Sequence, residues 1–375
     1  MEILFISERP VERISAADAG KLPDDGFLWL DATHDEVAAD VPAWRAAVER
    51  LTGVLLHDLH VSDALNLRHP SYFDSTQDYE LVVFRKLALT RESEGDAGAQ
   101  AAAEAEIRRK IPPALTKLAT QPVSFLLTDR VLVTVHGAPG HTIAQARKRL
   151  LDYQPKPGAS HTGRPPASPR ELMLRLLNAM VDQYLELRQP LTTQIDRWQR
   201  ALLNPRRPFS DWVALLDARI ELRKLDLLCE EQRDALQELR DHFVDTWQEG
   251  DNSRARDLQL VRINDVMEHV ARVLNHARRL ELSIESAVQI HFSAMAHRTS
   301  EIMRTLTVLT ALFMPLTLIT GIFGMNFIDM PLLKNPEGFW ITMGMMGVTV
   351  TVALLVFRRK RFLEDRVAGG QERGQ

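Results

Sequence analysis

Two long apolar runs near the C-terminus dominate the pattern of hydrophobic and polar positions along this chain. No charged residue occurs from Thr305 to Ile328 or from Gly338 to Phe357. In helices, which rise about 1.5 Å per residue, these runs extend about 36 Å and about 30 Å, enough to cross a hydrocarbon core of ~30 Å. The pattern therefore predicts a membrane protein with two spans.

The residues that flank the two spans predict their orientation. The short connection between the spans forces an antiparallel hairpin, so the bulk of the chain and its C-terminus lie on one side. Basic residues mark the cytoplasmic flank of a span. A basic cluster at 358–361 follows the second span, and His297, Arg298 and Arg304 precede the first, whereas the connection carries only Lys334. We expect both termini in the cytoplasm and the protein in the inner or plasma membrane.

The first ~150 residues alternate short apolar runs with helical patterns, which is typical of a mixed α/β domain. Residues 27–31 predict a strand, and the apolar spacing over 35–51 predicts one helix. The β-rich runs 122–127 and 131–136, separated by three polar residues, predict a hairpin. The stretch 92–113 begins rich in Ala, Glu and Gly, and we interpret it as a surface insertion.

A proline-rich stretch, 153–169, separates this α/β domain from an almost purely helical part. No proline or glycine occurs from Arg254 to Met314, so one helix of about 68 residues, ~100 Å, is expected to enter the first span. The predicted parts are a cytoplasmic α/β domain (1–165), a helical hairpin (166–253), a stalk helix (254–304), a first transmembrane helix (305–328), a second transmembrane helix (338–357) and a basic tail (358–375).

Composition excludes several classes of protein. The 375 residues carry a formal net charge of −4 with both signs interspersed, so we expect no nucleic-acid partner. The single cysteine, Cys229, excludes an intrachain disulfide and any multi-cysteine zinc site. No nucleophile and base pair, phosphate loop or metal triad stands out, so we expect neither an enzyme nor a bound cofactor.

One face of the first span differs in chemistry from the rest of that span. Its members step by three or four residues and lie within about 60° of one line on a helix. They mix small, hydroxyl and thioether groups, so they either let helices pack closely or line a conduit in a symmetric bundle. The members are Met303, Leu306, Thr310, Met314, Thr317, Gly321 and Gly324.

The sequence around the end of the first span resembles a known family. Met314-Pro315-Leu316-Thr317 precedes a Gly324-Met325-Asn326 tripeptide, and Met330-Pro331 follows it before a second span that ends in a basic cluster. This arrangement is similar to the CorA family of divalent-cation (Mg²⁺/Co²⁺) transporters. The resemblance covers most of the chain and is tightest over 300–362. It implies a cytoplasmic α/β domain, a long stalk helix and two C-terminal transmembrane helices, assembled as a funnel-shaped homopentamer.

The resemblance also implies roles for individual residues. The selectivity filter falls on Gly324, Met325 and Asn326. The pore lining falls on Met303, Leu306, Thr310, Met314, Thr317 and Gly321. A regulatory metal site, bridged between subunits, falls on Asp63, Asp265 and Glu268.

Several alternatives and departures accompany these assignments. Asp63 and Asp265 also fit ordinary surface charges, and the histidines at 57, 60 and 69 fit either hydrogen bonds in a turn or a zinc site. The chain has Leu332 where the family often has an acid after the signature, and Ser300 where the stalk often has an asparagine.

The resemblance predicts a channel for hydrated Mg²⁺ that also passes Co²⁺, with Ni²⁺ as a further candidate. Cytoplasmic divalent cation would close it, so Mg²⁺ is both substrate and regulatory ligand. Its partners would be divalent cations, the lipid bilayer and further copies of itself. The alternatives are a zinc transporter of the ZntB type and a two-span membrane scaffold or sensor that moves no ion.

Overall fold

The computed structural model describes residues 1–7, 10–16, 25–88, 119–138, 140–153, 164–204, 209–210, 212–246, 253–325, 332 and 336–359. The predicted insertion at 92–113 and the signature residue Asn326 lie outside these ranges. The chain divides into two compact units, Met1–Ala287 and Val288–Gln375.

In the first unit, the strands among the described residues form one seven-stranded sheet with the order β2-β1-β3-β7-β6-β5-β4. The strands are β1 (Glu2–Ser7), β2 (Glu12–Arg13), β3 (Gly26–Thr33), β4 (Tyr72–Ser75), β5 (Glu80–Ala88), β6 (Ala119–Leu127) and β7 (Val131–His136). The pair β3–β7 is parallel, and the other pairs are antiparallel. The predicted strand at 27–31 and the predicted hairpin of β6 and β7 are both confirmed.

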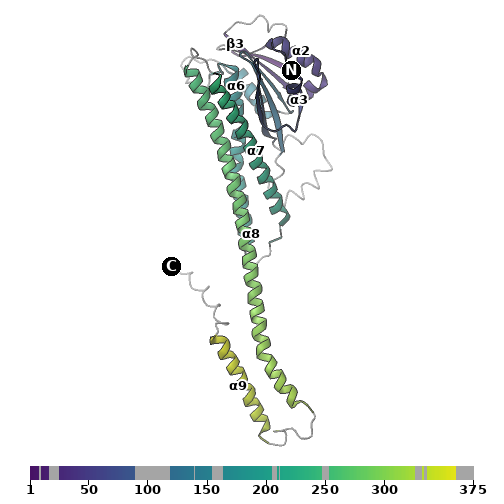
Figure 1. Cartoon of the computed structure of the whole chain (residues 1–375), viewed down its shortest axis with the longest axis vertical. Helices are drawn as coiled ribbons and strands as arrows, with labels where there is room; N and C mark the ends of the chain where they lie inside the picture. The colour runs from purple at the N-terminus through teal and green to yellow at the C-terminus, as the bar shows by residue number, and fades with distance from the viewer. Residues whose placement is uncertain are drawn as a thin grey trace. The chain divides into compact units, whose positions relative to one another are not determined.

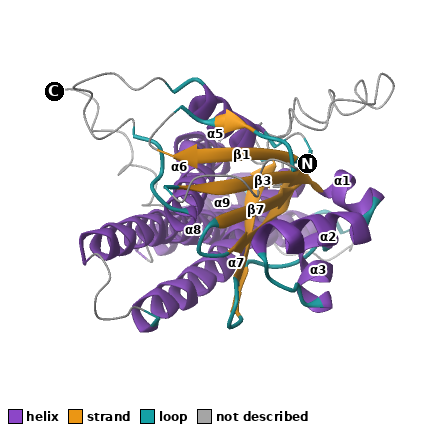
Figure 2. Ribbon diagram, turned by 90° about the horizontal axis from the view of Figure 1, so that it is seen from above, coloured by secondary structure: helices purple, strands orange, loops and turns teal. Residues whose placement is uncertain are grey.

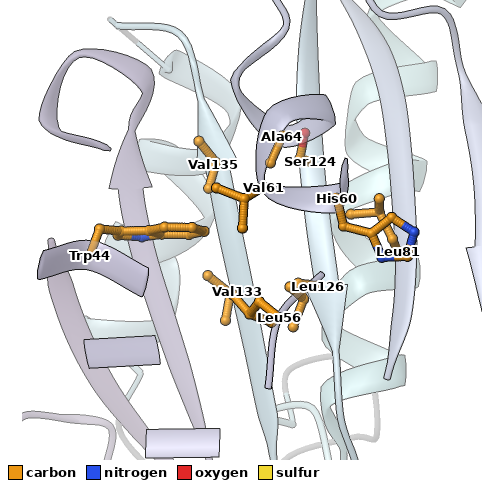
Figure 3. Close-up of a pocket in the computed structure, with 10 residues that line it drawn as sticks. All are labelled: Trp44, Leu56, His60, Val61, Ala64, Leu81, Ser124, Leu126, Val133 and Val135. Carbon is orange, nitrogen blue, oxygen red and sulfur yellow. The ribbon is translucent and has the colours of Figure 1, made fainter. Parts of the chain in front are cut away.

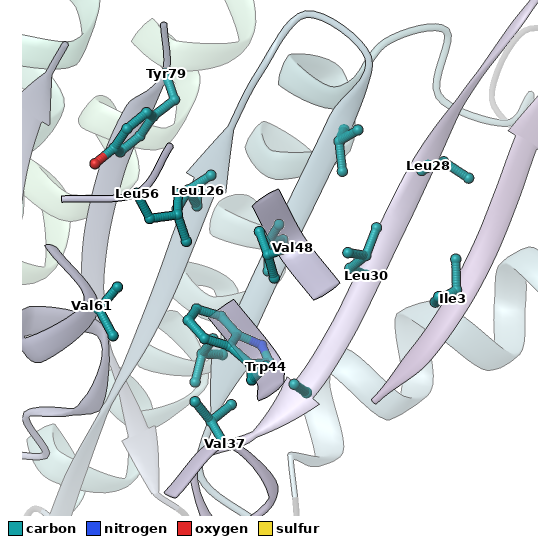
Figure 4. Close-up of a cluster of buried hydrophobic side chains, with 14 of the residues drawn as sticks. Ile3, Leu28, Leu30, Val37, Trp44, Val48, Leu56, Val61, Tyr79 and Leu126 are labelled. Carbon is teal, nitrogen blue, oxygen red and sulfur yellow. The ribbon is translucent and has the colours of Figure 1, made fainter. Parts of the chain in front are cut away.

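Helices cover both faces of this sheet, as Figure 2 shows from above. On one face lie α1 (His34–Ala39), α2 (Val41–Thr52) and α3 (Asp58–Leu65). Their apolar side chains join those of the strands in a buried cluster centred on Trp44, Val48 and Leu30 (Figure 4). This cluster fixes α3, the helix that carries Asp63, against the sheet.

The prediction of one helix over 35–51 is wrong, because the chain breaks at Asp40. Asp40 has an extended φ of −153° and its side chain accepts a hydrogen bond from the Ala43 N–H, so it caps a second helix. Pro42 lies in the first turn of that helix, where its missing N–H costs nothing. In one continuous helix, the Pro42 ring would clash with a carbonyl of the preceding turn.

The remaining helices of the first unit are long. They are α5 (His141–Leu151), α6 (Pro169–Leu202), α7 (Trp212–Asp245) and the first part of α8 (Ser253–Phe323). Figure 1 shows α6, α7 and α8 running side by side. On α8, Ile263, Val266 and Val270 are buried within the single chain. The helical hairpin formed by α6 and α7 therefore covers the apolar positions of the predicted stalk.

Polar contacts tie α8 to the hairpin along its length. The Arg262 guanidinium donates to Glu171 on α6 at 3.0 Å, and Arg278 donates to Asp226 on α7 at 2.7 Å. Further along, the Gln199 side-chain amide donates to the Ser283 carbonyl at 3.0 Å. The long helices α6, α7 and α8 are therefore joined by both apolar and polar contacts.

The second unit holds the end of α8 and the helix α9 (Gly338–Arg359). Each helix contains a window with a mean hydropathy of 2.0, long and apolar enough to span a membrane. Helix α8 continues through Pro315 and ends at Phe323, where the Gly324 N–H donates to the Thr320 carbonyl at 2.9 Å.

Candidate functional site

The predicted pore face of α8 is exposed within the single chain. Met303 is 57% exposed, Leu306 55% and Met314 72%. At Gly321 a Cβ would meet no atom within 4 Å. These apolar positions would be costly to leave in water but are available for contact with lipid or with other copies of the chain.

Threonines at two positions of this face present only acceptor oxygens. The Thr310 hydroxyl donates to the Leu306 carbonyl, and the Thr317 hydroxyl donates to the Phe313 carbonyl, both at 2.9 Å. Since each hydroxyl has a single proton, its oxygen is left to accept. The water shell of a cation points its O–H groups outward, so this face can accept hydrogen bonds from a hydrated cation.

The described part of the predicted filter lies where α8 ends. The Met325 N–H donates to the Ile322 carbonyl at 3.2 Å, and the Met325 side chain is exposed. A Cβ at Gly324 would come within 3.1 Å of the Thr320 carbonyl oxygen, so this turn is tight. Beyond it, Leu332 has a left-handed φ of 75°, an uncommon conformation for a leucine.

The predicted regulatory acids each contact a basic or histidine side chain of the same chain. Asp63 Oδ1 lies 3.5 Å from His69 Nε2, and Asp265 Oδ1 lies 3.6 Å from His269 Nε2. The Glu268 carboxylate accepts from Arg272 at 2.5 Å, and this hydrogen bond lowers the pKa of Glu268.

One chain does not assemble these acids into a metal site. Among the residues that the structure describes, no group of three or more His, Cys, Asp or Glu is arranged to hold a metal ion. Asp63 lies on α3, whereas Asp265 and Glu268 lie on α8.

The histidines near α3 take part in hydrogen bonds. His60 contacts the Tyr79 hydroxyl through Nδ1 at 2.8 Å and Asp74 through Nε2 at 3.0 Å. His69 donates from Nδ1 to the Pro70 carbonyl at 2.9 Å. Both rings therefore fit hydrogen-bonding residues better than a zinc site, His60 from within α3 and His69 from the segment that follows it.

A small cavity lies beneath α3, between that helix and the sheet (Figure 3). Its volume is about 10 Å³, and side chains such as Trp44, Val61 and Val133 line it. A space of that size holds about one water molecule. It is therefore a packing gap rather than a site for a small-molecule ligand.

Sequence reasoning missed two buried polar clusters in the α/β part. In one, Asp31 accepts from Thr134 at 2.6 Å and from Arg147 at 2.8 Å, and it lies 3.2 Å from His136. The other surrounds Arg85 on β5. In both cases the available signal was a charged residue within an apolar strand pattern, which requires buried partners.

Comparisons with known proteins agree with this architecture. A family model described as "CorA-like Mg2+ transporter protein" matches residues 24–359. The cobalt/magnesium transport protein CorA of Thermotoga maritima is 22% identical over 308 residues, which are 82% of this chain and 77% of that protein. The divalent cation transporter CmaX of Pseudomonas aeruginosa is 25% identical over 209 residues, 54% of this chain and 58% of that protein.

Solved structures show the same fold. The complete structure of the CorA magnesium transporter from Methanocaldococcus jannaschii superposes with a TM-score of 0.65 at 18% identity, covering 96% of this chain and 98% of that one. The full-length CmaX protein gives a TM-score of 0.61 at 18% identity, covering 96% and 97%.

The match to the family model spans nearly the whole described chain, from the α/β sheet to the end of α9. The expected combination of an α/β domain, a long helix and two C-terminal apolar helices is confirmed. A protein of this kind is a membrane transporter and not an enzyme. This chain belongs to the CorA family of divalent-cation transporters.

Proposed function

We propose that this protein is a Mg²⁺ channel that also passes Co²⁺, with Ni²⁺ as a further candidate. The ions move along the exposed face of α8, and Gly324, Met325 and Asn326 form the filter at its outer end. The observation that carries this proposal is the pair of acceptor hydroxyls, Thr310 and Thr317, set between apolar side chains on one helix face.

The chemistry of this face suits a cation that keeps its water. Mg²⁺ loses water reluctantly and usually keeps several water ligands when bound. Hydroxyl and carbonyl oxygens accept hydrogen bonds from that shell without replacing it, and neutral groups do not hold a dication too tightly to release. Inward movement of a dication gains about 4.6 kcal/mol per 100 mV of inside-negative potential, so no chemical coupling is required.

A conduit requires more than one copy of α8. We propose a homopentamer in which the exposed faces of five α8 helices surround the ion path. Both termini are cytoplasmic in this proposal, because Arg358 and Arg359 end the second span. The apolar positions Met303, Leu306 and Met314 then form constrictions that close by excluding water.

We further propose that Mg²⁺ regulates this channel from the cytoplasmic side. Asp63 from one subunit, with Asp265 and Glu268 from the α8 of its neighbour, would hold the regulatory ion. Two carboxylates repel each other when the site is empty and are bridged when a dication binds, so the ion stabilises one arrangement of the subunits. In this arrangement α3 of one subunit supplies Asp63, and α8 of its neighbour supplies Asp265 and Glu268.

The decisive experiment is ion flux into proteoliposomes that contain the purified full chain. Mg²⁺, Co²⁺ and Zn²⁺ are compared under an inside-negative potential, with Asn326→Ala as the filter variant and native mass measurement of the oligomer. We expect Mg²⁺ flux that Asn326→Ala abolishes and a mass of five chains. Absence of Mg²⁺ flux, or flux that Asn326→Ala leaves unchanged, would refute the proposal.

Regulation is tested in the same vesicles by varying Mg²⁺ on the side of the α/β domain. The double variant Asp63→Ala, Asp265→Ala should keep conducting at Mg²⁺ concentrations that close the wild-type channel. An unchanged dependence on Mg²⁺ would show that these acids do not regulate the channel.

A further inference from the structure

Arg85 on β5 makes an unusual set of contacts for a partly buried cation. Its guanidinium donates to the Leu67 carbonyl at 3.2 Å and to the His69 carbonyl at 2.8 Å. It also donates twice to Thr120 on β6, to the hydroxyl at 3.0 Å and to the carbonyl at 3.1 Å. The side chain thus holds the segment between α3 and β4 against the strand β6.

The segment that Arg85 holds also orients Asp63. The Asn66 N–H donates to the Asp63 carbonyl at 3.2 Å, and the His69 N–H donates to the Asn66 carbonyl at 3.0 Å. The His69 ring in turn lies 3.5 Å from the Asp63 carboxylate. Because Arg85 fixes the His69 carbonyl, it fixes the backbone from which this ring reaches Asp63.

The backbone of Arg85 is bound from the opposite side by the helical hairpin. Its carbonyl accepts from the Tyr184 hydroxyl on α6 at 3.0 Å and from the Gln232 amide on α7 at 2.7 Å. Both donors are only 1% exposed, and they also contact each other at 3.3 Å. Arg85 is therefore bonded to the Asp63 segment through its side chain and to both hairpin helices through its carbonyl.

We propose that Arg85 is a positioning residue that couples the state of Asp63 to the helices α6 and α7. This inference rests on the proposed regulatory role of Asp63. An ion that draws on the Asp63 carboxylate changes its contact with His69, and the rigid guanidinium fork passes a displacement of that segment to β5. The hairpin follows through Tyr184 and Gln232.

The hairpin helices contact α8, so the coupling has a route to the helix of the conduit. On α6, the Gln199 amide donates to the Ser283 carbonyl at 3.0 Å. On α7, Asp226 accepts from Arg278 at 2.7 Å. A displacement of α6 or α7 is thus transmitted through these contacts to the part of α8 in the same compact unit.

The test measures Mg²⁺ flux of the full chain in proteoliposomes at increasing Mg²⁺ on the side of the α/β domain. The readout is the Mg²⁺ concentration that halves the flux, relative to the flux of the same sample at low Mg²⁺. We expect Arg85→Met to raise this concentration about fivefold or more, a common size for coupling between sites. Arg85→Lys keeps the charge but not the planar guanidinium group, so its half-closing Mg²⁺ concentration should lie between those of the wild type and Arg85→Met.

Arg147→Met is the matched control. Arg147 is also a partly buried arginine of the α/β part, but it donates to Asp31 at 2.8 Å and pairs with Glu2 at 2.9 Å, away from the α3–β4 segment. Its variant should close at the wild-type Mg²⁺ concentration. A shift as large as that of Arg85→Met would show a general effect of loosening the domain and would overturn the coupling.

A double variant separates this inference from the proposal on which it rests. If Arg85 acts through Asp63, Arg85→Met should add nothing to the shift caused by Asp63→Ala. Additive shifts, or a shift with Asp63→Ala but none with Arg85→Met, would overturn the coupling and leave the regulation standing. No shift with Asp63→Ala would overturn both.

A milder variant keeps the test available if Arg85→Met fails to fold. Tyr184→Phe removes only the hydroxyl that binds the Arg85 carbonyl and keeps the buried ring. We expect it to raise the closing Mg²⁺ concentration in the same direction, by a smaller factor. A wild-type value for folded Tyr184→Phe would overturn the coupling.

Discussion

Replacing Thr317 by valine tests the proposed conduit most directly. Valine has nearly the shape of threonine but lacks the oxygen that accepts hydrogen bonds on the exposed face of α8. The substitution therefore changes the chemistry of the face with little change in its volume. The variant Thr317→Ser keeps the oxygen and should conduct as the wild type does.

The size of the effect follows from the energy of single hydrogen bonds. One bond between a hydration water and a hydroxyl contributes about 0.5–1.5 kcal/mol net. Losing one such bond at the highest barrier, about 1 kcal/mol, lowers the flux about 5-fold, and losing two lowers it about 30-fold. In a pentamer five hydroxyls are replaced together, so we expect a flux about 5- to 30-fold below that of the wild type.

The assay is Mg²⁺ flux in proteoliposomes at equal protein content and low regulatory Mg²⁺. Thr349→Val on α9 is the matched control, since the Thr349 hydroxyl makes the same intrahelical bond, to the Met345 carbonyl at 2.8 Å, but lies outside the proposed pore face. It should keep wild-type flux. Wild-type flux in Thr317→Val, or an equal loss in Thr349→Val, would refute the role assigned to the threonine oxygens.

Three further predictions concern titratable groups of the first unit. Burial alone would lower the pKa of His136, but its contacts with Asp31 raise it above 6.5, so the protonated ring stabilises the folded state at low pH and this stabilisation is lost as the pH rises through the folded-state pKa. The thermal unfolding temperature should fall over that pH range in the wild type and fall less in His136→Gln. Burial alone would raise the pKa of Glu171, but a backbone N–H and Arg175 lower it below 4.5, so the carboxylate stabilises the folded state above pH 4.5 and this stabilisation is lost as the pH falls through the folded-state pKa. In Glu171→Gln the thermal unfolding temperature should therefore fall less steeply at acid pH than in the wild type. Burial raises the pKa of the Cys229 thiol to about 12, so mass spectrometry should find no iodoacetamide adduct on the folded protein at about pH 8 and full labelling in denaturant.

The sequence was sufficient to predict the elements whose signal lies in neighbouring residues. The strands of the β6–β7 hairpin followed from two β-rich runs around a short polar turn, and the two apolar helices followed from their length alone. The break at Asp40 was also encoded locally, as an aspartate two residues before Pro42, which is a helix-start signal. The apolar spacing across it masked this signal, because both short helices turn the same kind of side chain to the sheet.

The contacts around the predicted regulatory acid could not be read from spacing. Gln232 and the Arg85 carbonyl are separated by 147 positions in the chain, and Tyr184 and Arg85 by 99. Only the fold of the sheet against the hairpin brings them together. The sequence marked Asp63 through a resemblance, whereas its contact with His69 and the role of Arg85 emerged from the structure.

The face of α8 also bears on the choice between magnesium and zinc. Zn²⁺ binds most strongly to thiolate and imidazole ligands, whereas Mg²⁺ takes oxygen and retains water. From Met303 to Gly321 the proposed lining offers no cysteine, histidine or carboxylate, and its polar groups are the hydroxyl oxygens of Thr310 and Thr317. In the proposed channel, such a face would distinguish cations by how large their water shell is and how tightly they hold it, and not by direct ligation. We therefore infer that a tightly hydrated dication is the cargo to which this face is best matched, and that Zn²⁺ gains nothing there from the ligands it prefers.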